Sequence, residues 1–530
     1  MTNSNYRVAK YTGIVMVATL LCRILGLGRE MVISNQFGAG LETDAFFVAF
    51  MIPNLLRSFL GEGALNTTFI PVFSDYLAYH NQKKADAFAS NVLNILIITL
   101  VVIILLGIWG APLIVNIVAS GFKQEPEKFE LTVRLTKIMF PYIGFAAVAA
   151  LFMGILNSYR QFFIPAFAPA MLNIGIISFA FLYSTKMGIY SLTIGVIIGG
   201  LVQALIHIPA LIKKHFNYQM IVDFHEPGIR NLFHLLMPAM FGLAIDKINF
   251  VVDRIIASYL AHGSISALYY ANRLMQFPLG VFGIALSIAI LPTLSRHVAK
   301  KEFEEMRDSF FFGVKILSFF ILPSTVGLIV LSHPIIRLFY EHGLFSSQDT
   351  RLTEIALVCY TVGLFAMATL RLIISTFYAL KDTKTPLKIG IFVVIFNIIL
   401  DLILVRYLAH AGIALATSIA AMIHLIILGV ALHRKVKGLF SGEFFSFFWK
   451  ICLASFLMGL SCWLVSQYFN FMLDLNVKIV QFAQVIISVT LGLMIYYFSG
   501  IILGISEFRN ARQIIRKIIK GKLKEEDINA

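Results

Sequence analysis

Long apolar stretches follow one another along almost the whole chain and are separated by short polar or basic connections. One helix needs about 20 apolar residues to cross the hydrocarbon core of a bilayer. Segment length, apolar content and turn residues together predict about fourteen membrane-spanning helices. They cover residues 11–37, 44–75, 88–119, 131–157, 163–184, 189–212, 231–260, 265–295, 310–338, 351–379, 386–408, 411–433, 445–468 and 479–505. The pattern therefore predicts an all-α polytopic membrane protein.

Composition and charge exclude several other classes of protein. Of the residues, 59% are apolar and 13% are charged, whereas a soluble domain has about 45–50% and about 25%. The net charge is +15, but the basic residues lie in short connections between apolar segments, where membrane topology places them. We therefore expect no nucleic-acid partner. The four cysteines lie within apolar stretches without metal-ligand spacing, which argues against a disulfide framework or a zinc site.

The distribution of Lys and Arg also predicts an orientation. Outside the predicted helices, these residues are in excess on the side that carries both termini. Because cytoplasmic loops are enriched in Lys and Arg, we expect a multi-pass membrane protein with both termini in the cytoplasm. The first apolar segment contains Arg23, Arg29 and Glu30 and lacks a small-residue cleavage pattern, so we do not expect a removable signal peptide.

An internal repeat with a period of about 221 residues divides the chain. Asp44-Ala-Phe-Phe-Val-Ala49 corresponds to Ser266-Ala-Leu-Tyr-Tyr-Ala271, and Ile70-Pro-Val-Phe-Ser74 corresponds to Leu291-Pro-Thr-Leu-Ser295. Each copy holds six predicted helices, an even number, so the copies run parallel, as in transporters whose site lies between two lobes. The predicted parts are an N-lobe (1–220), a C-lobe (221–440), two extra helices (441–505) and a basic amphipathic cytoplasmic tail (506–530). No phosphate-binding GxxxxGK[ST] loop occurs, and we expect a transporter rather than an enzyme.

Polar residues gather in the first two predicted helices and at the start of the second repeat. They are Arg23, Arg29, Asp44, Asn54, Arg57, Glu62 and Arg273. One arginine at the bilayer centre costs about 2.5–3.5 kcal/mol, so the four arginines must face water or acids rather than lipid. Two interpretations are open: buried ion pairs that hold helices together, or a positively charged cavity. Since Arg is suited to bidentate phosphate contacts, the second predicts an anionic substrate, such as a phosphate or diphosphate.

A second group consists of oxygen donors. Asn397 and Asp401 share one face of a predicted helix, with Thr417 in the next helix and Asp253 in an earlier one. Carboxylate, amide and hydroxyl oxygens suit a coupling Na⁺, and a buried carboxylate suits a coupling H⁺. Asp253 could instead pair with Arg254, and Asn397 could bond across helices. We expect no other cofactor.

Three stretches resemble a known family. CRILGLGRE (22–30) is followed by QFGAGLETDAFFVAFMIPNLLRSFLGEGALNTTFIPVFSDY (36–76) and by YYANRLMQFPLGVFGIALSIAILPTLS (269–295). With the fourteen-helix count, they resemble the MurJ (MviN) lipid II flippases of the multidrug/oligosaccharidyl-lipid/polysaccharide exporter superfamily. The resemblance extends over essentially the whole chain. Cys22 and Glu30 stand where family members often have Ser and Asp, and neither change removes a charge.

The resemblance implies two six-helix lobes around a central cavity, with the last two helices forming a groove for a polyprenyl tail. It implies a flippase of the bacterial cytoplasmic (inner) membrane. Such a flippase moves lipid II, the undecaprenyl-diphosphate-linked disaccharide-pentapeptide, from the cytoplasmic to the outer leaflet for peptidoglycan synthesis, cell wall biogenesis and cell shape. Implied partners are lipid II, membrane lipids and cell-wall synthesis proteins. The family's functional arginines carry over to Arg23, Arg29, Arg57 and Arg273, and its cavity acids to Asp44 and Glu62.

Alternatives remain open at this point. The chain could export another polyprenyl-diphosphate-linked glycan. A drug/cation antiporter of the same superfamily would be expected to rely on a cavity acid without surplus arginines. A scaffold for cell-wall assembly would need no arginine in the membrane.

Overall fold

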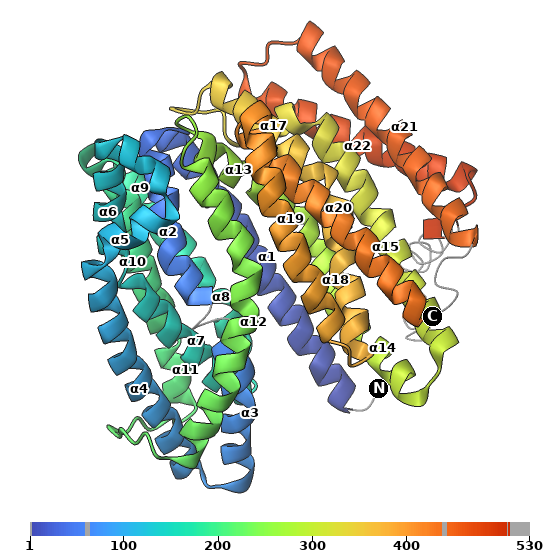
Figure 1. Cartoon of the computed structure of the whole chain (residues 1–530). Coiled ribbons are helices and arrows are strands. Elements are labelled where there is room, and N and C mark those ends of the chain that lie inside the picture. The colour runs from blue at the N-terminus through green and yellow to red at the C-terminus, as the bar shows by residue number, and fades with distance from the viewer. Residues whose placement is uncertain (1–2, 59–63, 437–441, 506, 509–530) are drawn as a thin grey trace. The chain divides into compact units, whose positions relative to one another are not determined.

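The computed structural model describes residues 3–58, 64–436, 442–505 and 507–508, and every regular element in these ranges is a helix (Figure 1). The all-α prediction is confirmed. Each predicted helical range coincides with one helix or with two or three consecutive helices. The predicted tail at 506–530 lies almost entirely outside the described residues.

The described chain forms two compact units, Met1–Ala267 with Tyr340–Asp349, and Leu268–Phe339 with Thr350–Ala530. The helices of the first unit are α1 (Asn3–Phe37), α2 (Leu41–Arg57), α3 (Ala64–Tyr79), α4 (Gln82–Trp109), α5 (Ala111–Val118), η2 (Ser120–Gln124), α6 (Pro126–Met139), α7 (Tyr142–Ser158), α8 (Phe163–Phe167), α9 (Pro169–Met187), α10 (Tyr190–Leu205), α11 (Ile208–Lys213) and α12 (Pro227–Ala257). Helix α13 (Ser264–Pro278) begins in the first unit and continues into the second.

The second unit contains the remaining helices. They are η3 (Leu279–Ile284), α14 (Ala285–Lys300), α15 (Phe303–Val330), α16 (Ser332–Phe339), α17 (Ser347–Val362), α18 (Leu364–Ala379), α19 (Lys384–Leu408), α20 (His410–Lys435), α21 (Gly442–Met472) and α22 (Lys478–Ile502). Here η3 is a π-helical segment between α13 and α14.

The compact units do not divide the chain where the sequence repeat predicted. The repeat places the boundary at 220, before α12, whereas the units separate at 267, within α13. Helix α12 groups with the first unit because it packs against α3, α4 and α5. Ile229 and Leu232 of α12 enter the same buried cluster as Phe69 and Phe88. The division into repeat copies concerns the sequence and stays a prediction.

Glycine or proline lies at several positions where the sequence predicts one helix and the structure has two. Gly110 separates α4 from α5, Pro141 lies between α6 and α7, and Gly363 lies between α17 and α18. Proline lacks an amide donor and glycine lowers helix stability, so the chain turns at these positions. The pattern of apolar residues alone does not predict such turns.

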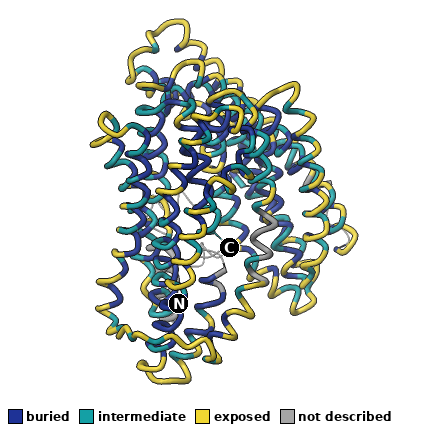
Figure 2. Tube along the Cα trace, turned by 60° about the vertical axis from the view of Figure 1, so that its left-hand side comes forward, coloured by how far each residue is buried: buried dark blue, intermediate teal, exposed yellow. Residues whose placement is uncertain are grey.

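Among the described residues, ten helices are long and apolar enough to cross a membrane. The number is eleven if α17 and α18, bent by 40°, count as one span. Many single helices have one buried and one exposed face (Figure 2). Large apolar side chains such as Val101, Leu105 and Trp109 are exposed on α4, as expected of a surface that faces lipid. The chain is a multi-pass membrane protein, and the count of fourteen crossings stays a prediction.

Aromatic packing forms the cores. In the first unit, the ring centroids of Phe69 and Phe73 lie 5.2 Å apart and those of Phe69 and Phe88 lie 6.0 Å apart. In the second unit, the Tyr496 hydroxyl donates to the Phe319 carbonyl at 2.8 Å, and the Phe508 ring lies 4.7 Å from that of Phe319. These contacts join α15 to α22 and to the segment that follows α22.

A polar contact joins helices α19 and α20 of the second unit. Asp382 precedes α19 and accepts bonds from Lys435, at the end of α20, and from the Thr385 hydroxyl at 2.7 Å. The hydrogen bond from Lys435, followed by those from Thr385, lowers the pKa of the Asp382 carboxyl from its ordinary value. The start of α19 is thereby held against the end of α20.

Helices α9 and α10 pack with their backbones almost in contact. A Cβ on Gly175 would lie 2.6 Å from the Cα of Gly199, and a Cβ on Gly195 would lie 2.8 Å from the Cα of Ile176. Gly195 and Gly199 form a GxxxG pair, which lets two membrane helices approach closely. Any larger residue must push the two helices apart.

The variant Gly199→Val should therefore be destabilised by about 1–3 kcal/mol, because its side chain would be forced into the backbone of Leu172. The measurement is the thermal unfolding midpoint of the purified protein in detergent. Gly390→Val is the matched control, since a Cβ at that helical glycine meets nothing within 4 Å. An equal midpoint for the two variants would contradict the packing argument.

Candidate functional site

Two of the predicted arginines lie on α1. Arg29 is only 4% exposed and forms an ion pair with the fully buried Glu30. Its guanidinium carbon lies 6.0 Å from the centre of the Phe50 ring on α2. Arg23, two turns earlier, is half-buried. Helix α1 thus holds a paired cation against an aromatic face, which fixes the position of the Arg29 head group.

Helix α2 carries the next pair of predicted residues. The Nε of Arg57 donates to Oδ1 of Asn54 at 2.9 Å. The spacing of three residues puts both side chains on one face of the helix. Asn54 therefore orients the Arg57 guanidinium. Glu62, predicted as a cavity acid, lies outside the described residues.

Arg273 lies on α13, in the second unit, and is exposed. The other three arginines belong to the first unit. The four arginines are therefore divided between the two units.

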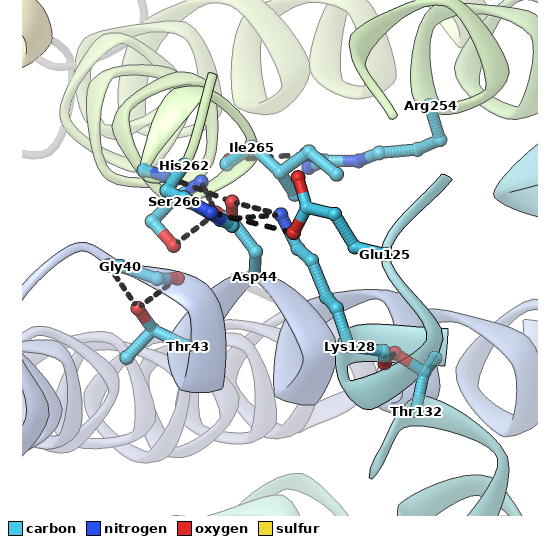
Figure 3. Close-up of polar contacts among 11 residues, drawn as sticks. Gly40, Thr43, Asp44, Glu125, Lys128, Thr132, Arg254, His262, Ile265 and Ser266 are labelled. Atoms are coloured by element: carbon cyan, nitrogen blue, oxygen red, sulfur yellow. Dashed lines mark hydrogen bonds and ion pairs between the residues drawn. The ribbon is translucent and has the colours of Figure 1, made fainter. Parts of the chain in front are cut away.

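Asp44, at the start of α2, is the centre of a buried hydrogen-bond network (Figure 3). Its Oδ1 accepts the Ser266 amide at 2.9 Å and the Ser266 hydroxyl at 2.7 Å. Its Oδ2 accepts the Gly263 amide at 2.9 Å and pairs with Nζ of Lys128 at 3.1 Å. Asp44 and Lys128 are both almost completely buried. The carboxylate therefore joins α2 to α6 and to the first turn of α13.

Lys128 has further partners around it. Its Nζ lies 4.3 Å from the centre of the Phe122 ring and 3.3 Å from Nδ1 of His262. Nε2 of His262 lies 3.3 Å from a carboxylate oxygen of Glu125. An ammonium group has only donors, so Nδ1 must accept and the ring proton must sit on Nε2, facing Glu125. The arrangement selects one neutral tautomer of His262.

The sequence pattern groups Asp44 with the arginines and does not indicate Lys128, His262 or Glu125. All three lie in or beside connections between predicted helices, where charged residues are ordinary. No spacing in the sequence links position 128 to position 44. Only the fold brings the ammonium group and the carboxylate together.

The predicted cation donors are divided between the two units. Asn397 and Asp401 lie one turn apart on α19, and both are almost completely buried. Thr417 on α20 donates its hydroxyl to the Ile413 carbonyl of its own helix at 3.0 Å. Asp253 lies on α12, in the first unit. In the part of the chain that the structure describes, no group of three or more His, Cys, Asp or Glu residues could hold a metal ion.

The neighbours of these donors are engaged elsewhere. Nη1 of Arg254 donates to the Ile265 carbonyl at 3.1 Å, and its guanidinium carbon lies 5.3 Å from the centre of the Phe250 ring. The hydroxyl of Ser418 donates to the carbonyls of Cys359 and Tyr360 and so ties α20 to α17. Of the oxygen donors, only Asn397 and Asp401 share one helix face.

The variant Asp44→Asn should lose about 3–5 kcal/mol of stability, because Lys128 would stay buried without its counter-charge. The thermal unfolding midpoint of the purified protein measures this loss. The double variant Asp44→Asn/Lys128→Met should recover part of it, because no unpaired charge remains.

The matched control for this test is Glu130→Gln, on the same helix as Lys128. Glu130 pairs with Arg134 at 3.2 Å, but both side chains are 67% exposed. An exposed pair of this kind contributes little, so its loss should leave the midpoint unchanged. A midpoint for Asp44→Asn equal to that of the control would show that the network does not hold the fold.

Comparison with known proteins identifies relatives over most of the chain. The family model described as "Lipid II flippase MurJ" matches residues 33–503. A probable lipid II flippase MurJ of Buchnera aphidicola is 36% identical over 452 residues, which cover 84% of this chain and 87% of the relative. A second probable lipid II flippase MurJ, from Rickettsia prowazekii, is 32% identical over 502 residues, covering 94% of this chain and 99% of the relative.

Solved structures show the same likeness. One, described as "Lipid II flippase MurJ, inward closed conformation", matches with a TM-score of 0.76 and 34% identity over 92% of this chain and 99% of its own. An inward-facing multidrug resistance MATE family transporter of the MOP superfamily matches with a TM-score of 0.67. At 15% identity over 80% of this chain and 98% of its own, that likeness shows a shared fold alone.

Proposed function

This chain belongs to the lipid II flippase MurJ family, and from that premise we propose that it moves lipid II from the cytoplasmic to the outer leaflet of the inner membrane. The cycle is alternating access, in which a central site opens first to one side and then to the other. The proposed orientation has both termini in the cytoplasm. No step of this transport is catalytic.

The observation that carries the substrate assignment is the family match over residues 33–503. It runs from the last turn of α1 to the end of α22 rather than over a single motif. The fold shared with multidrug transporters does not decide between substrates, because one fold serves many functions. The charged side chains add support for an anionic head group.

The arginines are proposed to bind the diphosphate of lipid II. Arg29 is held by Glu30 and Phe50, and Arg57 is held by Asn54. Guanidinium groups that are already fixed lose less freedom when they bind, so they favour a bidentate phosphate contact. We assign Arg23 and Arg273 to the same site, with Glu62 as an acid that limits its positive charge. Asp44 is assigned to the border of the site, since Lys128 balances its charge.

The variants Arg29→Ala, Arg57→Ala and Arg273→Ala should each fail to support growth when the native flippase is depleted. Losing one charge-assisted contact to a desolvated anion costs about 1.5–3 kcal/mol, or roughly 10- to 150-fold in affinity. Lysine at the same positions should rescue only in part, because it lacks the planar fork. Growth is measured at matched protein levels in the membrane.

Arg134→Ala is the control, since this arginine is exposed and pairs only with Glu130 among the contacts described. It should support normal growth. Full growth with all three alanine variants would remove the arginines from the substrate site and leave the family assignment intact.

A coupling Na⁺ or H⁺ is proposed to bind at Asp401, with Asn397 and Thr417 beside it and Asp253 in the first unit. A carboxylate buried in an apolar helix must be neutralised by a proton or a cation, or paired with another group. An ion drives transport only if it binds one conformation more tightly than the other. The site should therefore be complete in one conformation alone.

Asp401→Asn should abolish the dependence of lipid II transport on Na⁺ and pH gradients across vesicles. A coupling free energy of 1–3 kcal/mol corresponds to a change of about 5- to 150-fold. Asp474→Asn, in the exposed connection between α21 and α22, is the control and should keep the dependence. Transport indifferent to both gradients in the unmodified protein would reject the coupling site.

A further inference from the structure

The connection between α11 and α12, residues 217–226, is bound along one face of α4 and is called the strap below. Asn91 of α4 holds its second half. The Asn91 amide nitrogen donates to the Asp223 carbonyl at 2.8 Å and to Glu226 at 2.7 Å. The Asn91 oxygen accepts the Asp223 amide at 2.8 Å. One side chain thus pairs with both backbone groups of Asp223, as a neighbouring strand would.

Asn94 holds the tip of the strap. It donates to the carbonyls of Gln219 at 3.1 Å and Ile221 at 2.8 Å, and it accepts the Tyr218 hydroxyl at 2.7 Å. Ser90 accepts the Gln219 amide at 3.1 Å. The polar side chains that bind the strap are therefore spaced along one face of α4. They are Asp86, Ser90, Asn91 and Asn94.

The other side of the strap is apolar and exposed. Met220 is 92% exposed, and Tyr218, Val222 and Phe224 are each about half exposed. These four alternate with residues 217, 219, 221 and 223, whose backbone groups face α4. An extended chain places successive side chains on opposite sides. The strap thus turns its polar backbone toward α4 and the side chains of Met220, Val222 and Phe224 outward, while the Tyr218 hydroxyl reaches back to Asn94.

The face of α4 that binds the strap continues beyond the strap as an apolar surface. Ser90 and Asn94 are followed on the same helical face by Ile98, Val101 and Leu105, which are exposed and apolar. Ile98 is four residues, or about 6 Å, beyond Asn94 along the helix. This face is therefore turned toward lipid where the strap ends. Figure 1 shows the strap, in green, beside the lower end of α4.

We propose that the strap rests in the bilayer interface at the end of α4, with Met220, Val222 and Phe224 inserted among the lipids. The strap continues the lipid-facing surface of α4 into the head-group region with its large side chains exposed. Exposed lysines flank it at Lys83, Lys84 and Lys213, and such residues attract anionic head groups. The occupant of this surface is therefore an anionic phospholipid leaflet.

The test places an environment-sensitive fluorophore on Met220→Cys, in the full chain with its four native cysteines replaced by alanine. The protein is reconstituted in vesicles of phosphatidylethanolamine and phosphatidylglycerol. The label should be quenched several-fold more by lipid-attached nitroxide than by aqueous iodide. His225→Cys is the matched control on the same strap, because its side chain is 86% exposed beside Asp223, and its label should show the opposite preference.

A second pair of variants tests whether the polar face of α4 determines how deeply the strap lies in the bilayer. Asn94→Ala should move the label at position 220 toward water and increase its iodide quenching several-fold. Thr99→Ala should leave the quenching unchanged, because Thr99 bonds only within α4, to Ile95, among the contacts described.

Two results would overturn the proposal. One is iodide quenching at position 220 equal to that at position 225. The other is shielding of position 220 that disappears when the vesicles hold fewer protein copies, which would identify a second copy of this chain as the occupant. Neither result depends on whether the chain transports lipid II.

Discussion

A charge removed from water must be paired, and this constraint determines how the first unit is held together. Lys128 and Asp44 are both almost fully buried, so each requires the other. The Asp44 carboxylate also accepts the amides of Gly263 and Ser266, two donors at the beginning of α13 that no helical carbonyl can satisfy. One side chain therefore joins α2, α6 and α13. The arginine environments follow the same rule, with Glu30 beside Arg29.

The contact between Asp44 and Ser266 gives the sequence repeat a structural meaning. The repeat aligns these two positions, and in the structure they are hydrogen-bonded to each other at 2.7 Å. Asp44 in one copy and Ser266 in the other are also chemically complementary, as an acceptor and a donor. The difference between the copies at this position is what allows the contact.

Much of the fold could be predicted because apolar segments in a membrane have few alternatives to the helix. The predicted ranges therefore match the helices. Interruptions at Gly110, Pro141 and Gly363 could have been predicted too, but only from residue type and not from hydropathy. The pairing of Asp44 with Lys128 could not have been predicted, because nothing in the sequence around position 128 distinguishes this lysine from a solvent-exposed one.

The same distinction applies to the candidate sites. The Asn54 and Arg57 pair follows from a spacing of three on one helix, and Asn397 and Asp401 follow from a spacing of four. Groupings across helices are less secure, since Thr417 donates to its own helix and Asp253 belongs to the other unit from Asp401. Local periodicity fixes which residues share a face. It does not fix which faces meet.

Hydrogen bonds at both ends of α12 anchor this helix within the first unit. Just before α12, Glu226 accepts bonds from Asn91 and from the Tyr76 hydroxyl. Just after it, Ser258 accepts the Gly121 amide at 2.9 Å. Both ends of α12 are thus fixed to the first unit, although the repeat assigns this helix to the second copy. The place of α12 is thus set by the hydrogen bonds at its two ends rather than by its position in the sequence repeat.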